Sequence, residues 1–130
     1  MKIIVVLPTY NEAENLENMV TALRGLPVSD LSVLIMDDNS PDGTGEIGDR
    51  LASEFPGKVE IIHRPGKQGL GKAYIHGFRE ALQRGADLIL QMDCDFSHSP
   101  SYIPEMVKII ERGEVDIVLG SRYTKGGRLD

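Results

Sequence analysis

The sequence contains few residues of several kinds, and each shortage excludes a class of protein. Cys94 is the single cysteine, so no disulfide can form within the chain and nothing indicates an oxidising compartment. The longest uninterrupted apolar run covers residues 3–7, far short of the roughly 20 residues that span a bilayer, and no signal-peptide pattern precedes it. We therefore expect a cytoplasmic protein with no transmembrane segment in this chain.

Basic residues are also scarce, because 14 Lys and Arg face 20 Asp and Glu for a formal net charge of -6. Binding to nucleic acid needs clustered basic side chains, so we expect no nucleic-acid partner. Acidic side chains do suit a bound cation. The 130 residues, 41% hydrophobic and 26% charged, are enough for one globular domain.

Short β-branched runs alternate with longer segments of helical period, a pattern typical of βα units around a parallel sheet. Several of the runs are apolar at consecutive positions, as expected for strands covered on both faces. We expect strands at residues 2–7, 32–37, 59–63, 87–92 and 116–119. The predicted fold class is α/β, with an open, doubly wound, mostly parallel sheet.

Apolar residues at helical spacing predict four helices between and after these strands. We expect Gly25, Gly85 and Gly113 to end the first, third and fourth helices, and Thr44 to cap the second. Apolar residues at helical spacing mark the third helix: Ile75, Phe78 and Leu82, together with Ala81.

Ligands bind such sheets at the carboxyl ends of the strands, so the loops that follow the strands should carry the chemistry. Asp93 and Asp95 follow one buried strand, and alternate residues that leave a strand can point the same way. Two carboxylates suit Mg²⁺ or Mn²⁺ bound together with substrate phosphates. The alternative interpretation is a solvated loop in which Ser97 and Ser99 help to cap the next helix. We expect Cys94 to be a small residue packed beneath the pair, because hard cations prefer oxygen to thiolate.

Asp37 and Asp38 end another strand, where nucleotide-binding sheets often place an acid against ribose or base. Residues 37–44 also form a strong turn signal, so one of the two acids can simply serve the turn. The three histidines share no metal-ligand spacing, and we expect them to be structural or exposed.

The glycine-rich segment 66–72 imitates two phosphate-binding motifs. Ala73 stands where a P-loop needs Ser or Thr, and Tyr74 stands where a dinucleotide fingerprint needs its third glycine. A glycine loop with Lys67 can still approach phosphate through backbone N–H groups and charge. Arg122, after the fifth expected strand, can neutralise phosphate with its planar guanidinium.

Five motifs in order resemble those of a known family. These motifs are PTYNE at 8–12, DDNSPDGT at 37–44, GLGKAY at 69–74, MDCDFSH at 92–98 and GSRY at 120–123. Together they resemble the motifs of family 2 glycosyltransferases, in particular the dolichol-phosphate (polyprenol-phosphate) mannosyltransferases. The resemblance covers nearly the whole chain. It implies the N-terminal portion of a GT-A fold, as one domain over residues 1–130 that ends before the family's domain does.

The resemblance also implies a reaction and a set of site residues. Mannose would pass from GDP-mannose to a dolichyl or polyprenyl phosphate at the membrane surface, with inversion and with Mg²⁺ or Mn²⁺. Pro8, Tyr10, Glu12 and Asp38 would surround the nucleoside. The charge of the glycine loop, rather than the resemblance, leads us to expect that Lys67 binds the donor. Asp93 would hold metal and diphosphate, Asp95 would hold metal and act in catalysis, and Arg122 would contact phosphate as a second catalytic residue.

Three other functions stay open. The donor can be a UDP-sugar such as UDP-glucose, because base selection depends on backbone geometry around Tyr10 and Asp38. The chain can also be a nucleotide-sugar binding module without transfer activity. A nicotinamide oxidoreductase ranks last, because the glycine fingerprint is missing.

Overall fold

A computed structural model describes residues 1–66, 70–95 and 99–111. Its four strands, all parallel, form one sheet in the order β3-β2-β1-β4. The strands are β1 (Ile3–Thr9), β2 (Leu31–Asp37), β3 (Val59–His63) and β4 (Leu88–Gln91), and the helices are α1 (Leu16–Arg24), α2 (Thr44–Glu54), α3 (Leu70–Gln83), the 3-10 turn η1 (Pro100–Tyr102) and α4 (Ile103–Glu111).

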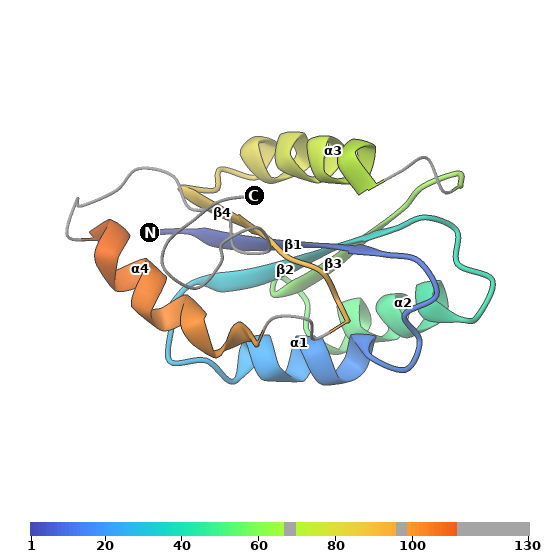
Figure 1. Ribbon diagram of the computed structural model, residues 1–130, viewed down its shortest axis with the longest axis horizontal. Coiled ribbons are helices and arrows are strands. Elements are labelled where there is room, and N and C mark those ends of the chain that lie inside the picture. Colours follow the sequence, from blue (N-terminus) through green and yellow to red (C-terminus); the bar gives the residue numbers. More distant parts are fainter. Residues whose placement is uncertain (67–69, 96–98, 112–130) are drawn as a thin grey trace.

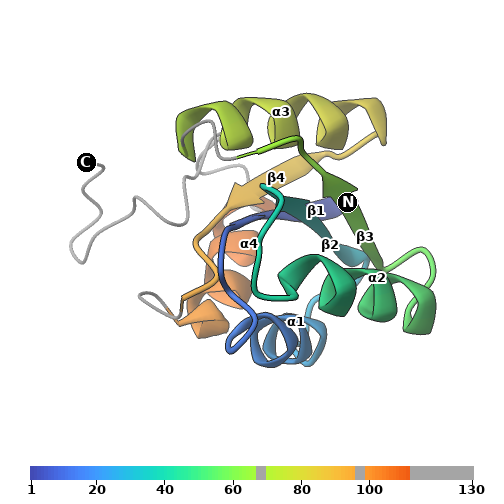
Figure 2. The same ribbon diagram turned by 90° about the vertical axis from the view of Figure 1, so that its right-hand side faces the viewer.

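Helices cover both faces of the sheet, as the doubly wound prediction requires. Helix α3 lies on one face, and α1, α2 and α4 lie on the other (Figures 1 and 2). The four predicted strands in the described part of the chain are confirmed, with ends that differ from the prediction by at most two residues. The expected fifth strand, 116–119, and the expected end of α4 at Gly113 lie outside the described residues.

The core consists of two layers, one on each face of the sheet. In β1, Ile3, Val5 and Leu7 belong to the layer beneath α1 and α4, whereas Ile4 and Val6 belong to the layer beneath α3. Because successive strand side chains point to opposite faces, a strand between two helical layers must be apolar at every position. This is why the run at residues 3–7 does not alternate.

Strand β1 is longer than the sequence indicates. We expected Pro8 and Thr9 in the following loop, but both are buried in β1, where Pro8 lies opposite Met36 of β2. Proline donates no backbone hydrogen bond, so it suits a strand position that has an unpaired side. The pairing of β1 with β4 ends at Val6, which leaves Pro8 without a β4 neighbour.

Helix α3 faces the sheet with small residues rather than with the large apolar residues that mark it in the sequence. Ile75, Phe78 and Leu82 are 55%, 44% and 52% exposed. Ala73 and Ala81 are buried, and a Cβ at Gly77 would lie 2.4 Å from Val6 Cγ1. The helix therefore approaches the sheet so closely that only small side chains fit between them.

Candidate functional site

The loops after β1 and β2 are joined side by side by a row of hydrogen bonds. Three consecutive backbone N–H groups of the first loop donate to side chains of the second: Asn11 to Ser40 Oγ at 3.0 Å, Glu12 to Thr44 Oγ1 at 3.0 Å and Ala13 to Asp42 Oδ2 at 3.1 Å. The Glu12 contact is half-buried and the other two are exposed. Backbone N–H groups without a strand or helix partner are commonly satisfied by side-chain acceptors of this kind. The polar residues of the DDNSPDGT motif thus shape one edge of the site.

Asp37 serves the turn. Its carboxylate accepts hydrogen bonds from Thr9 Oγ1 at 2.7 Å, Ser40 N at 3.1 Å and Ser40 Oγ at 2.6 Å, and the residue is almost completely buried. A buried carboxylate with three donors is satisfied within the protein. The expectation that one of the two adjacent acids serves the turn is therefore confirmed for Asp37.

Thr44 does not cap helix α2, contrary to the prediction. The helix begins at Thr44 itself, and the capping position belongs to Gly43, whose φ of 93° is left-handed. The Thr44 hydroxyl instead donates to Asp42 and accepts the N–H of Glu12. Its buried hydroxyl links the two loops, a role that depends on a contact distant in sequence.

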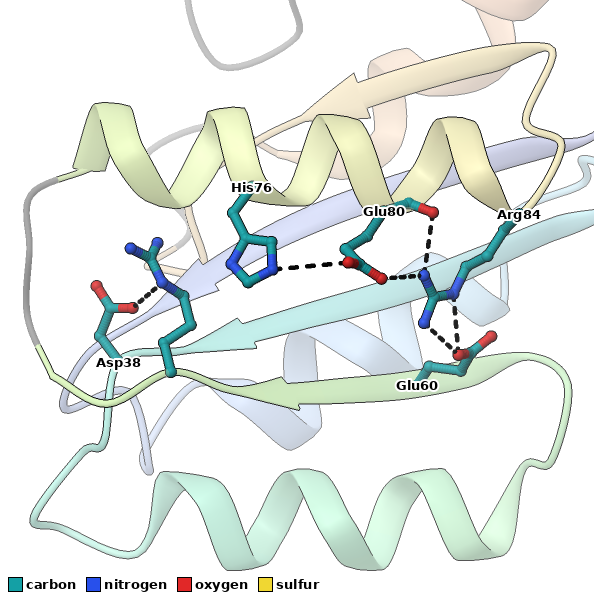
Figure 3. Close-up of polar contacts among 6 residues, drawn as sticks. Asp38, Glu60, His76, Glu80 and Arg84 are labelled. Carbon is teal, nitrogen blue, oxygen red and sulfur yellow. Dashed lines mark hydrogen bonds and ion pairs between the residues drawn. The ribbon is translucent and has the colours of Figure 1, made fainter.

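Asp38 is buried against Arg64, and both residues are 6% exposed. Arg64 Nε lies 3.2 Å from Asp38 Oδ1, and a dashed line at Asp38 in Figure 3 marks this ion pair. Buried charges of this kind persist only when they are paired. The sequence analysis overlooked Arg64, although it directly follows β3, which is the neighbour of β2 and ends at the same edge of the sheet.

Asp93 and Asp95 follow β4 at the same edge and flank a buried Cys94. Burial, together with the smaller effect of the negative charges of Glu12, Asp95 and Asp93, raises the pKa of the Cys94 thiol to about 12. The thiol is therefore protonated at neutral pH and packs in the core, as expected. Hard cations also prefer oxygen to sulfur, which leaves the two carboxylates as candidate ligands.

Asp93 accepts a hydrogen bond from Tyr74 on α3. Tyr74 Oη lies 2.7 Å from Asp93 Oδ1, and the contact is half-buried. The sequence analysis considered Tyr74 as a departure from a glycine motif and as the last residue of the GLGKAY motif, without assigning it a role. No spacing rule predicts this contact, because it depends on how α3 crosses the sheet.

Glu12 brings a further negative charge to the region. Partial burial is the main cause of its raised pKa, the hydrogen bond from Asn15 lowers that pKa, and repulsion by Asp95 and Asp93 raises it again. Among the described residues no group of three His, Cys, Asp or Glu has the spacing of a complete metal site. Two carboxylates that also need ligand phosphates and water fit Mg²⁺ or Mn²⁺, which rarely occupy an all-protein cage.

The other predicted site residues divide into three groups. Tyr10 is 37% exposed beyond the end of β1, next to the loops joined above, whereas Pro8 is buried within the strand. Lys67 and Arg122 lie outside the described residues.

Two of the histidines lie on the surface. His63 Nε2 is 2.8 Å from Asp49 Oδ1, and His76 Nε2 is 3.7 Å from Glu80, which also pairs with Arg84 (Figure 3). The expectation of structural or exposed histidines is confirmed for these two. His98 lies outside the described residues. Within the described ranges, no helix is long and apolar enough to cross a membrane.

Two curated relatives align with essentially the whole chain. The undecaprenyl-phosphate mannosyltransferase of Micrococcus luteus is 45% identical over 130 residues, which is 99% of this chain and 51% of the relative. The dolichol-phosphate mannosyltransferase of Pyrococcus furiosus is 42% identical over 134 residues, covering 100% of this chain and 36% of the relative. The chain thus spans about half, or less, of the length of these relatives.

The fold has a counterpart among solved structures of GT-A glycosyltransferases. The mannosyltransferase PcManGT from Pyrobaculum calidifontis, in complex with GDP-Man and Mn²⁺, superposes with a TM-score of 0.58 at 26% identity, over 72% of this chain and 27% of that one. The family model described as Glycosyl transferase family 2 matches residues 4–130. These matches confirm the resemblance drawn from the five motifs, and the chain belongs to glycosyl transferase family 2.

Proposed function

We propose that this protein takes part in transfer of mannose from GDP-mannose to a polyprenyl or dolichyl phosphate, with inversion at the sugar and with Mg²⁺ or Mn²⁺. The observation that carries the proposal is the pair Asp93 and Asp95 at the carboxyl end of β4, in a chain 45% and 42% identical to two lipid-phosphate mannosyltransferases. The solved mannosyltransferase with GDP-Man and Mn²⁺ supports the choice of donor and cation.

The nucleoside would bind where the loops after β1 and β2 meet. Pro8 forms the buried floor, Tyr10 is exposed, and Glu12 and Asp38 are acceptors for hydroxyl or base N–H groups. Arg64 holds the Asp38 carboxylate in one orientation, which lowers the cost of ordering that side chain when a ligand binds. The row of hydrogen bonds between the two loops keeps their backbones in place.

The diphosphate would lie over Asp93 and Asp95. A divalent cation held there supplies neutralisation of the charge that grows on the departing nucleoside diphosphate. Lys67 and Arg122 would add positive charge beside the phosphates, with Asp95 and Arg122 as the catalytic residues. The carboxylate of Glu12, destabilised by partial burial and then by its acidic neighbours, would gain from the same neutralisation.

The acceptor needs little activation. A lipid phosphate is already an anion at neutral pH, so the protein need not supply a strong general base. Inversion then requires that one phosphate oxygen approach the anomeric carbon in line with the leaving diphosphate. This places the demand on alignment and on charge neutralisation, which fits a site rich in carboxylates and cationic groups.

The relatives' length bears on where the acceptor binds. Because the chain spans about half of the Micrococcus luteus relative, we propose that residues 1–130 supply the donor-binding portion. We also propose that this portion lies in the cytoplasm, at the membrane periphery, where a lipid phosphate is accessible. A UDP-sugar as donor, or a module that binds donor without transferring sugar, remain the competing functions. They differ from the proposal in base preference and in product formation.

Calorimetric titration separates the donors. The chain is titrated with GDP, GDP-mannose and UDP, each with and without Mn²⁺, and we expect GDP compounds to bind more tightly and only with the cation. The Asp87→Asn variant should bind these ligands as the wild-type chain does, and so controls for the loss of a negative charge away from the site. Asp87 precedes β4 at the opposite edge of the sheet and accepts the Lys2 N–H. A preference for UDP would establish the competing donor.

Transfer is measured with GDP-mannose and a short polyprenyl phosphate, comparing the 130-residue chain with one extended past Asp130. We expect the longer chain to be active and the shorter one to transfer slowly, because misplacing the acceptor by ~1 Å can cost about a hundredfold in rate. Full activity of the 130-residue chain would show that its acceptor site is complete. Absence of mannosyl lipid from both chains would overturn the proposed reaction.

A further inference from the structure

We propose that Tyr74 is the positioning residue of the metal site: its hydroxyl orients Asp93 so that the second carboxylate oxygen is directed to the cation. The inference rests on the proposed function, because it assumes that Asp93 ligates a divalent cation. The observation that carries it is the 2.7 Å hydrogen bond from Tyr74 Oη to Asp93 Oδ1.

The acids at this edge of the sheet differ in what already holds them. Asp37 accepts three hydrogen bonds from Thr9 and Ser40, and Asp38 faces the guanidinium of Arg64. A cation cannot displace those contacts without leaving buried donors or a buried charge unsatisfied. Neither residue is therefore suited to ligate a metal.

Asp93 is held in a different way. The phenol of Tyr74 is neutral, so its hydrogen bond orients the carboxylate without neutralising the charge that attracts a cation. One oxygen accepts the hydroxyl, and the other keeps its lone pairs for a ligand bond. Groups that orient a ligating side chain in this way commonly change metal affinity by about 10- to 100-fold when they are removed.

The position of Tyr74 is itself determined by three contacts between α3 and the sheet. Its backbone carbonyl accepts a hydrogen bond from Gln91 Nε2 of β4 at 3.2 Å, two residues before Asp93. Ala73 beside it is buried, and Gly77 one turn later lies against Val6 of β1. Because α3 and β4 are both anchored close to this contact, the packing of the helix holds the backbone of Tyr74 within reach of Asp93.

Mn²⁺ binding in the presence of GDP, followed by electron paramagnetic resonance, tests the inference with the 130-residue chain. We expect Tyr74→Phe to weaken Mn²⁺ binding about tenfold and to change the spectrum of the bound ion, because Asp93 loses its fixed orientation. The melting temperature should stay within about 2 °C of wild type, since Phe keeps the ring in place. Tyr102→Phe is the matched control, because it removes the hydroxyl of a half-buried tyrosine in the core layer on the other face of the sheet.

Each outcome distinguishes the inference from the proposed function. Unchanged Mn²⁺ affinity in Tyr74→Phe would overturn the inference and leave the proposed function standing. A wild-type chain that binds no Mn²⁺ with GDP or with UDP would overturn both. Loss of Mn²⁺ affinity together with a large fall in melting temperature, or an equal loss in Tyr102→Phe, would show a structural role and also overturn the inference.

Discussion

Gly77 offers a direct test of how α3 packs on the sheet. In an open helix interior, Gly→Ala stabilises by about 1 kcal/mol, because alanine loses less backbone entropy. At this position the new Cβ would lie 2.4 Å from Val6 Cγ1 and 3.3 Å from Met36 Cγ. Val6 is β-branched and sits in an inner strand, so it cannot rotate away, and overpacking of this kind costs about 1–3 kcal/mol.

A contact as short as 2.4 Å belongs in the upper half of that range, so the net effect of Gly77→Ala should be a loss of about 1–2 kcal/mol in the free energy of unfolding. Gly71→Ala in the same helix is the matched control. A Cβ at Gly71 meets no atom within 4 Å, so that variant should be as stable as wild type or more stable by up to about 1 kcal/mol.

Urea unfolding of both variants measures the two free energies. Equal or increased stability of Gly77→Ala would refute the close approach of α3 to β1. A Val6→Ala, Gly77→Ala double variant should lose less stability than the sum of the single variants, because removing the valine methyl groups makes room for the new Cβ. The Gly77→Ala shift should also weaken Mn²⁺ binding, since it moves Tyr74 away from Asp93.

Three further predictions concern the site. Asp38→Asn should weaken GDP binding about tenfold and leave metal-dependent pyrophosphate binding nearly intact. Calorimetry at a temperature where the variant is folded measures both affinities, and equal losses for both ligands would mean that Asp38 serves the metal site or the fold. EDTA, or the double variant Asp93→Ala, Asp95→Ala, should abolish GDP binding in the same assay, and undiminished affinity would contradict the metal assignment. The Cys94 thiol, with its pKa raised to about 12, should resist iodoacetamide at pH 8 in the native chain and react in urea, and rapid labelling of the native chain would show that Cys94 is accessible. Because the unfolded thiol ionises near 9.0 and the native thiol does not, the free energy of unfolding should fall as the pH rises above about 9.

The sequence by itself determined the features that depend on local pattern. The continuous apolar run of β1 indicated a strand covered on both faces, and the parallel order placed the acids after β2 and β4 at one edge of the sheet. The turn chemistry of residues 37–44 predicted a structural role for one of two adjacent aspartates, and Asp37 has it. The five motifs also indicated the family, which the comparisons confirm.

Tertiary structure alone decided which side of α3 faces the sheet. The large apolar residues Ile75, Phe78 and Leu82 have helical spacing, but so do the small residues around Gly77. Periodicity identifies a helix with an apolar face, yet it does not state the distance between helix and sheet. Here that distance is short, so Val6 excludes large side chains from the interface and the apolar stripe lies outside.

The polar pairs of the site were decided at the same level. Arg64 meets Asp38 because β3 lies beside β2, and Tyr74 meets Asp93 because α3 crosses the sheet toward the end of β4. Each pair joins residues about 20 positions or more apart, where no periodic rule relates one side chain to the other. The sequence thus determined which carboxylates gather at the edge of the sheet. The packing of strands and helices decided which carboxylate is neutralised and which stays available to a cation, because each carboxylate's state depends on the partner that it meets in space.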